Sequence, residues 1–80
     1  MVTVYALKSV KTTKIYVGMT TDVSKRLREH NAGRSKFTSA FVPWVIIYRE
    51  DCPDFLQGRI REKYLKSTAG KKFIKKILEE

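Results

Sequence analysis

The sequence has one cysteine, one histidine and no long apolar run, and these absences narrow the class of protein. Cys52 stands alone among 80 residues, so no disulfide forms within the chain, and a reduced, cytoplasmic setting is expected. No apolar stretch approaches the roughly 20 residues of a membrane-spanning helix, and the N-terminus lacks the pattern of a secretory signal. No Cys/His cluster has the spacing of zinc ligands, and no glycine-rich phosphate loop is present.

Acidic residues are also scarce, and the resulting charge indicates the kind of partner. Eight Asp and Glu face 17 Lys and Arg, which gives a formal net charge of +9. So much positive charge on one small domain predicts a polyanionic partner, with nucleic acid the leading candidate. An anionic membrane surface or an acidic protein fits the charge too. The 42% apolar residues and nine aromatics favour a folded single domain.

Hydrophobic patterning predicts an α+β fold. Runs rich in β-formers indicate strands at 2–9, 14–19 and 43–50, the first two joined as a hairpin by a short polar turn. Helices are expected from 22 to about 31, from Pro53 in the first turn to about Lys66, and over 71–80, after a break at 67–70. We expect a three-stranded, mainly antiparallel sheet with helices packed on it, in the order β-β-α-β-α-α.

Two charged residues lie on the apolar side of the first expected helix. On a helical wheel, Val23 and Leu27 point inward, and Arg26 and His30 fall beside Val23. An arginine there is costly to bury without a partner. It either extends along the edge of the core to water, or it lines a concave surface beside the sheet. By contrast, Lys25, Arg28 and Glu29 are expected on the solvated face.

The second helix shows a similar anomaly, because a carboxylate falls within an apolar stripe. Glu62 lies on the side formed by Phe55, Gly58 and Leu65, whereas Leu56, Ile60 and Tyr64 form a second stripe. Two apolar sides predict a helix packed between the sheet and the last helix. Glu62 is the one acid between residues 59 and 76, amid eight basic residues, so an ion pair with Arg59, Lys63 or Lys66 explains it equally.

Two tyrosines stand on the two arms of the expected hairpin. Tyr5 and Tyr16 point to one face if the register allows, either as core aromatics or as polar groups of a site. Gly18 follows two residues after Tyr16 and suits a strand where another group approaches the backbone closely.

Together these residues resemble the GIY-YIG nuclease superfamily. Its two half-motifs appear as Thr3-Val4-Tyr5 and Tyr16-Val17-Gly18, with ten residues between the tyrosines. The pattern T-x-D-x-x-x-R-x-x-x-H-N-x-G follows over 20–33, and Glu62 lies in "REKYLK". The resemblance runs from Val2 to about Leu78. It implies one catalytic domain over 1–80, without the additional DNA-binding domain that many members carry.

The resemblance implies a metal-dependent endonuclease that hydrolyses DNA phosphodiester bonds, in repair or recombination. Glu62 is then the sole protein ligand of Mg²⁺ or Mn²⁺, and Arg26 neutralises the scissile phosphate. Tyr5 is the expected general base, and nearby cations are expected to lower its pKa from about 10. Tyr16 positions water or phosphate, His30 orients Tyr5 or shares its proton transfer, and Gly18 lets the site pack closely.

Basic residues outside this set are expected to contact phosphates without reading sequence, so that branched or nicked DNA is favoured and a partner protein supplies specificity. The alternatives are a non-cleaving nucleic-acid-binding module of the same fold and an anion-binding scaffold. The expected nucleic-acid contacts are Arg34, Lys36, Lys63, Lys66, Lys71 and Lys72.

Overall fold

The sheet consists of an N-terminal hairpin and a third strand that comes later in the chain. In the computed structural model, which describes residues 1–79, β1 (Val2–Ser9) pairs antiparallel with β2 (Ile15–Thr20). β3 (Trp44–Cys52) pairs antiparallel with the other edge of β1, giving the order β2-β1-β3. The predicted three-stranded antiparallel sheet is confirmed, with β2 and β3 as its edges.

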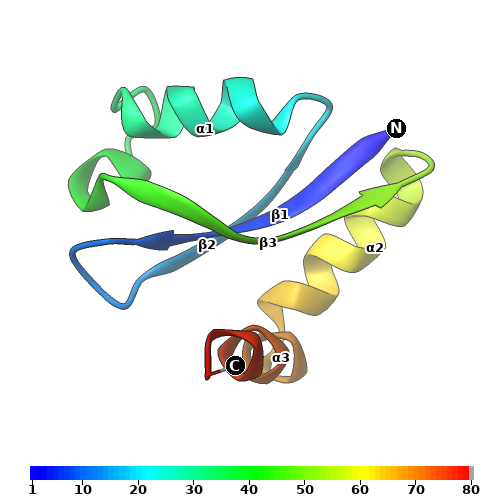
Figure 1. Cartoon of the computed structure of the whole chain (residues 1–80). Coiled ribbons are helices and arrows are strands. Elements are labelled where there is room, and N and C mark those ends of the chain that lie inside the picture. Colours follow the sequence, from blue (N-terminus) through cyan, green and yellow to red (C-terminus); the bar gives the residue numbers. More distant parts are fainter. Residues whose placement is uncertain (80) are drawn as a thin grey trace.

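Helices cover both faces of this sheet (Figure 1). α1 (Val23–Asn31) and the short 3-10 helix η1 (Thr38–Phe41) lie on one face, where Tyr5, Leu7 and Trp44 form a buried cluster. α2 (Phe55–Lys66) and α3 (Thr68–Glu79) lie on the other, over Val4, Ala6 and several neighbours. The expected α+β class and the order β-β-α-β-α-α are confirmed. No helix within residues 1–79 is long and apolar enough to cross a membrane.

Aspartates cap the N-termini of helices α1 and α2. Asp22 precedes α1 and accepts a hydrogen bond from the Lys25 amide at 3.0 Å, and Asp54 accepts from the Gln57 amide at 2.9 Å. These carboxylates satisfy amides that have no partner inside the helix. The prediction of Pro53 in the first turn of α2 is wrong, because Asp54 is the cap and Pro53 lies before it.

Two other boundaries also differ from expectation. β3 extends to Cys52, a buried free cysteine, because its far end continues to pair with Val2 and Thr3. α3 begins at Thr68, so only Ser67 separates it from α2. The predicted break over 67–70 is therefore too long. Gly70 belongs to the first turn of α3 and packs so tightly on α2 that a side chain there would collide with backbone.

The packing of α2 also corrects one prediction. Its side chains Leu56, Ile60 and Tyr64 are exposed, so this stripe does not pack against α3. The buried side carries Gly58 and Leu65. Val45 is exposed as well, so β3 is not covered on both faces along its whole length.

Candidate active site

The two hairpin tyrosines lie on the same face of the sheet. Tyr5 is opposite Gly18 in the β1–β2 register, and Leu7 is opposite Tyr16. Since alternate residues of a strand share a face, the register places all four toward α1. The tyrosine rings lie 6.2 Å apart between centroids. The expectation that both point to one face is confirmed.

Gly18 leaves the space that the tyrosines occupy. A Cβ atom at this position would lie 2.8 Å from the Tyr5 hydroxyl and 3.0 Å from the Tyr16 ring. Both distances are shorter than ordinary van der Waals contacts. The close approach predicted for this glycine is therefore an approach of two side chains, and any larger residue displaces at least one of them.

His30 is fully buried and joins this cluster from α1. Its Nε2 atom lies 3.2 Å from the Tyr5 hydroxyl, and its Nδ1 atom lies 2.9 Å from Oγ1 of Thr38 in η1. The Thr38 hydroxyl also donates to the Ser35 carbonyl oxygen at 3.5 Å, because a carbonyl can only accept. Its oxygen is therefore left to accept a hydrogen bond from His30. The network therefore assigns the imidazole proton to Nδ1, so that Nε2 accepts from Tyr5.

The surroundings of His30 keep it neutral. Burial lowers its pKa below the ordinary 6.5, and the Arg26 guanidinium lowers it further, against a weaker opposite effect of Glu29. A buried imidazole loses hydration when it becomes charged, and a neighbouring cation adds repulsion. His30 is thus a proton acceptor at neutral pH.

Arg26 lies beside both tyrosine hydroxyls. Burial opposes its charge, but hydrogen bonding to Tyr5 and Tyr16 outweighs this and raises its pKa. The side chain retains 35% of its accessible surface, and its Nη1 atom lies 3.6 Å from the Glu29 carboxylate. Glu29 is therefore a half-buried partner of Arg26, whereas the wheel placed it on the solvated face. The sequence left open whether this arginine extends to water or lines a site. Both hold, because its side chain is partly exposed and also lies beside the two tyrosines.

Arg26 favours ionisation of Tyr5, but burial outweighs this effect. Burial is the largest effect and Tyr16 the next, and together they raise the pKa of Tyr5 to about 12 despite the Arg26 hydrogen bond. The Glu62 carboxylate makes a smaller contribution to this rise. Arg26 lowers this pKa as predicted, but the net pKa lies above 10 and not below it, because only 1% of the residue is exposed and desolvation disfavours the phenolate.

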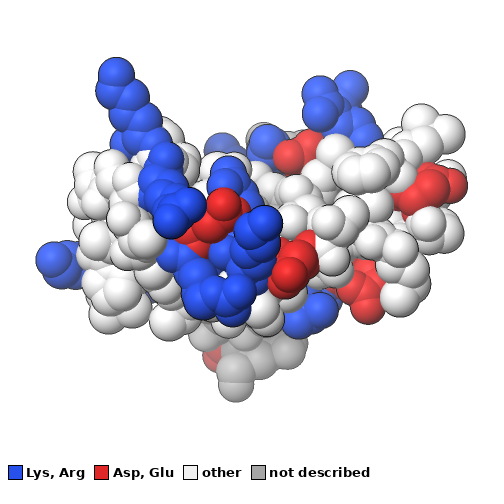
Figure 2. Space-filling view, turned by 90° about the horizontal axis from the view of Figure 1, so that it is seen from above, with Lys and Arg blue, Asp and Glu red and all other residues white. Residues whose placement is uncertain are grey.

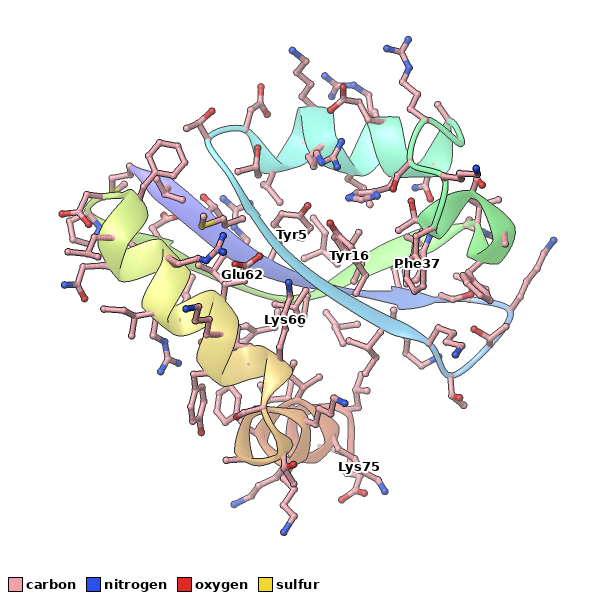
Figure 3. All side chains as sticks on the ribbon, turned by 180° about the vertical axis from the view of Figure 1, so that it is seen from behind. Tyr5, Tyr16, Phe37, Glu62, Lys66 and Lys75 are labelled. Atoms are coloured by element: carbon pink, nitrogen blue, oxygen red, sulfur yellow. The ribbon has the colours of Figure 1, made fainter. Side chains whose placement is uncertain are left out.

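Glu62 reaches the tyrosines from the opposite face of the sheet. In Figure 3 it extends from α2 toward Tyr5, alongside the edge strand β2. Its side chain is 13% exposed and forms ion pairs with Lys66 at 3.3 Å and with Arg59 at 3.9 Å. The expected ion pairs are thus present for two of three named partners. Within residues 1–79 no three His, Cys, Asp or Glu cluster as a metal site, so Glu62 stands as a lone carboxylate.

The predicted nucleic-acid contacts do not form one patch. Arg34 and Lys36 are exposed in the loop between α1 and η1, whereas the four lysines lie on α2 and α3. Figure 2, viewed onto the α1 side, shows basic side chains gathered there with acidic ones among them. Lys66 and Lys71 line a groove beside the site, and Lys63 and Lys72 do not.

Sequence reasoning missed three residues that hold or flank the site. Thr38 fixes the tautomer of His30. Asn31 ties the end of α1 to β3, because its side chain accepts from the Trp44 amide at 2.6 Å and donates to the Trp44 carbonyl at 3.2 Å. Phe37 is 59% exposed, and its ring lies 6.5 Å from that of Tyr16. The signal available was an aromatic within the basic run "GRSKF".

Comparison with known proteins agrees with this geometry. A family model described as the GIY-YIG catalytic domain matches residues 1–76. The chain belongs to the GIY-YIG family. Among curated relatives of this GIY-YIG chain, a UPF0213 protein of Staphylococcus haemolyticus is 34% identical over 77 residues, covering 95% of this chain and 93% of the relative.

Two other relatives match over shorter segments. UPF0213 proteins of Desulfotalea psychrophila and Streptococcus sanguinis are 32% and 45% identical over 57 and 40 residues, or 69% and 49% of this chain. These segments span about half of each relative, 52% and 46% respectively. No solved structure matches the chain significantly.

Proposed function

We propose that this GIY-YIG chain is a metal-dependent endonuclease that hydrolyses phosphodiester bonds in DNA, in repair or recombination. The observation that carries the proposal is the gathering of five reactive side chains from four elements. β1, β2, α1 and α2 bring together Tyr5, Tyr16, Arg26, His30 and Glu62.

Arg26 binds the scissile phosphate in this proposal. Its guanidinium is partly exposed, lies beside two tyrosine hydroxyls and pairs with Glu29 at 3.6 Å, so it is already directed into the site before a phosphate binds. A planar fork of N–H donors matches phosphate oxygens better than an ammonium does. Positive charge placed where negative charge develops in the transition state stabilises it directly.

Tyr5 and His30 receive the proton of the attacking water. A free phenolate is rare at neutral pH, because the pKa of Tyr5 is about 12. The hydrogen bond to His30 offers another route. As the water proton moves to the Tyr5 oxygen, the tyrosine's own proton moves to Nε2 of His30, so that no phenolate accumulates. Tyr16, which is half-buried, positions the water or the phosphate.

Glu62 suits a Mg²⁺ or Mn²⁺ ion as a single protein ligand. Mg²⁺ commonly keeps several waters and takes one or two carboxylates plus substrate phosphates, which fits a lone carboxylate beside a phosphate-binding arginine. Such an ion supplies polarisation of the phosphoryl group and stabilisation of the leaving oxygen. In the free protein Lys66 and Arg59 hold the Glu62 carboxylate in place.

The alternative is a non-cleaving nucleic-acid-binding module of the same fold. Two observations favour it: the Glu62 carboxylate is already paired with two cations, and the pKa of Tyr5 is raised. The alternative keeps the basic surface and gives the buried cluster a structural role.

One experiment separates the two. The purified protein is incubated with plasmid and with branched DNA, in Mg²⁺, in Mn²⁺ and in chelator, alongside Glu62→Ala and Arg26→Ala. The endonuclease proposal expects metal-dependent nicking that both substitutions abolish. No nicking of any substrate by the wild-type protein, with DNA binding intact, would establish the alternative instead.

A further inference from the structure

A groove of about 640 Å³ opens between the edge strand β2 and helix α3, directly beside the site. Its floor is apolar, and within residues 1–79 no carboxylate belongs to its lining. Tyr16 of the site lines the groove, and so does Lys66, which pairs with Glu62 at 3.3 Å, so the groove adjoins the site. The residues that define the groove here are Tyr16, Leu65, Lys66, Lys71, Ile74 and Lys75.

The chemistry of this groove suits a nucleic-acid strand. Lysines supply charge for phosphates, and the apolar floor accepts sugars and bases. Lys71 and Lys75 are one helical turn apart on α3 and line the groove, whereas Lys72 and Lys76 of the same helix do not. Two of the four lysines of α3 therefore lie at the groove, and the other two lie outside it.

Phe37 lies on the other side of Tyr16. Its ring is 6.5 Å from Tyr16 and 5.8 Å from Phe41, yet 59% of the residue is exposed. Arg34 and Lys36 precede it in the exposed loop, and the Lys14 ammonium lies 5.7 Å from the Phe41 ring centroid. An exposed ring among cations is the arrangement by which proteins stack unpaired bases and hold the adjoining phosphates.

We propose that the scissile strand binds unpaired along a line from Phe37, past Tyr16, into the groove between β2 and α3, with one base stacked on Phe37. This inference rests on the proposed function, because it names the form of the substrate. Stacking on a protein ring requires a base whose face is not covered by its neighbour, which a single strand offers and an intact duplex does not. The substrate is thus single-stranded for several nucleotides around the cleaved bond, as in a flap, gap or branch.

The stacking step is tested by binding in chelator, where no cleavage occurs. The probe is a single-stranded DNA oligonucleotide carrying 2-aminopurine, whose fluorescence is quenched by stacking, with its fully paired duplex for comparison. Phe37→Ala should weaken single-strand binding about 5- to 100-fold and restore the fluorescence, with duplex affinity changed less than about twofold. Phe37→Trp should keep both affinity and quenching.

Phe55 provides a matched control, since it is 60% exposed but lies at the start of α2. Phe55→Ala should bind as the wild type does. Equal single-strand affinities for Phe37→Ala and Phe55→Ala would overturn the stacking inference.

The groove is tested by the salt dependence of the same binding. Lys75→Ala should lower the slope of log affinity against log salt by about 0.7, the value for one lost phosphate contact on a single strand. Lys76→Ala removes the same charge from the same helix outside the groove, and its slope should match the wild type. Equal slopes for the two variants would contradict the proposed path.

These measurements do not depend on catalysis. If Phe37→Ala and Lys75→Ala bind like their controls while the wild type still nicks DNA, the strand path is wrong and the endonuclease proposal stands. If the effects appear but no DNA is cleaved in any metal, the strand path stands and the endonuclease proposal is wrong.

Discussion

The Tyr5 hydroxyl and the Nε2 atom of His30 lie 3.2 Å apart inside the protein, although 25 residues separate them. The contact joins the central strand β1 to helix α1. It gives the buried tyrosine a partner that can take its proton, and it depends on a third residue, Thr38, which accepts from the other imidazole nitrogen. The orientation of His30, and with it the hydrogen bond to Tyr5, is therefore set from η1.

Thr38→Val should impair nicking although Thr38 contacts no substrate. Removing the hydroxyl leaves the Nδ1–H of buried His30 without an acceptor, at a cost of about 1–3 kcal/mol in the free energy of unfolding. The other tautomer, which cannot accept from Tyr5, becomes competitive. Nicking rates and denaturant unfolding of Thr38→Val measure both effects.

Thr21→Val, at an exposed position before α1, is the control for this change and should leave both quantities unchanged. In a double-mutant cycle, Thr38→Val should have little further effect on the nicking rate in a Tyr5→Phe background, because both act on the same proton. Additive losses would show that Thr38 does not act through Tyr5.

Stability should fall as the solution is acidified below neutrality. The unfolded chain binds a proton on His30 at the ordinary pKa of 6.5, and the folded chain binds it only at a lower pH. Between these two values the unfolded state holds more protons, so the free energy of unfolding decreases as pH falls, by at most about 1.4 kcal/mol per pH unit. Denaturant unfolding between pH 7.5 and 5.5 measures this slope.

His30→Gln lacks the titrating group, so its slope over the same range should be flatter than that of the wild type. The groups facing His30, Arg26 and Glu29, are retained in the variant and keep their own contributions. Identical slopes would mean that another group carries the pH dependence.

Gly18→Ala should destabilise the fold and disturb the site at once. The new methyl group meets the Tyr5 hydroxyl at 2.8 Å, and overpacking of this kind costs about 1–3 kcal/mol. The nearest atom is the hydroxyl oxygen, so the cost in unfolding free energy should be smaller in a Tyr5→Phe background. An equal cost in both backgrounds would place the strain elsewhere.

Arg26→Lys should reduce nicking although the charge is kept. The guanidinium reaches both tyrosine hydroxyls and Glu29 together, which a single ammonium does not reproduce. Loss of one such preorganised group lowers rates by roughly 10²-fold. Arg28→Lys, on the exposed side of the same helix, should nick at the wild-type rate, and a similar loss in both variants would contradict a specific role for Arg26.

Much of the fold could be predicted because its signals are local. The run of β-formers in 2–9 and the apolar stripe around Val23 depend on near neighbours in the chain, and the structure confirms the strand and the helix that they predict. The inward placement of Arg26 and His30 followed from helical periodicity alone. The resemblance to the GIY-YIG family then connected these residues with Glu62, which lies on the other face of the sheet.

Other features depend on burial and on packing between elements, which no local sequence pattern indicates. Arg26 stabilises the Tyr5 phenolate, but burial outweighs it, and burial was not available from sequence. The early start of α3 depends on the fit of Gly70 against α2. Because that start positions Lys75 beside β2, the groove was not predicted either.

The central claim is that the carboxylate of Glu62 serves phosphodiester cleavage, and single-turnover nicking of DNA in Mg²⁺ tests it most directly. Glu62→Gln keeps the size and polarity of the side chain but removes its charge, and Glu79→Gln makes the same change at the exposed end of α3. We expect the wild type and Glu79→Gln to nick at equal rates and Glu62→Gln to be slower by at least about 10²-fold, with its DNA affinity retained. Nicking by Glu62→Gln at the wild-type rate would contradict the account.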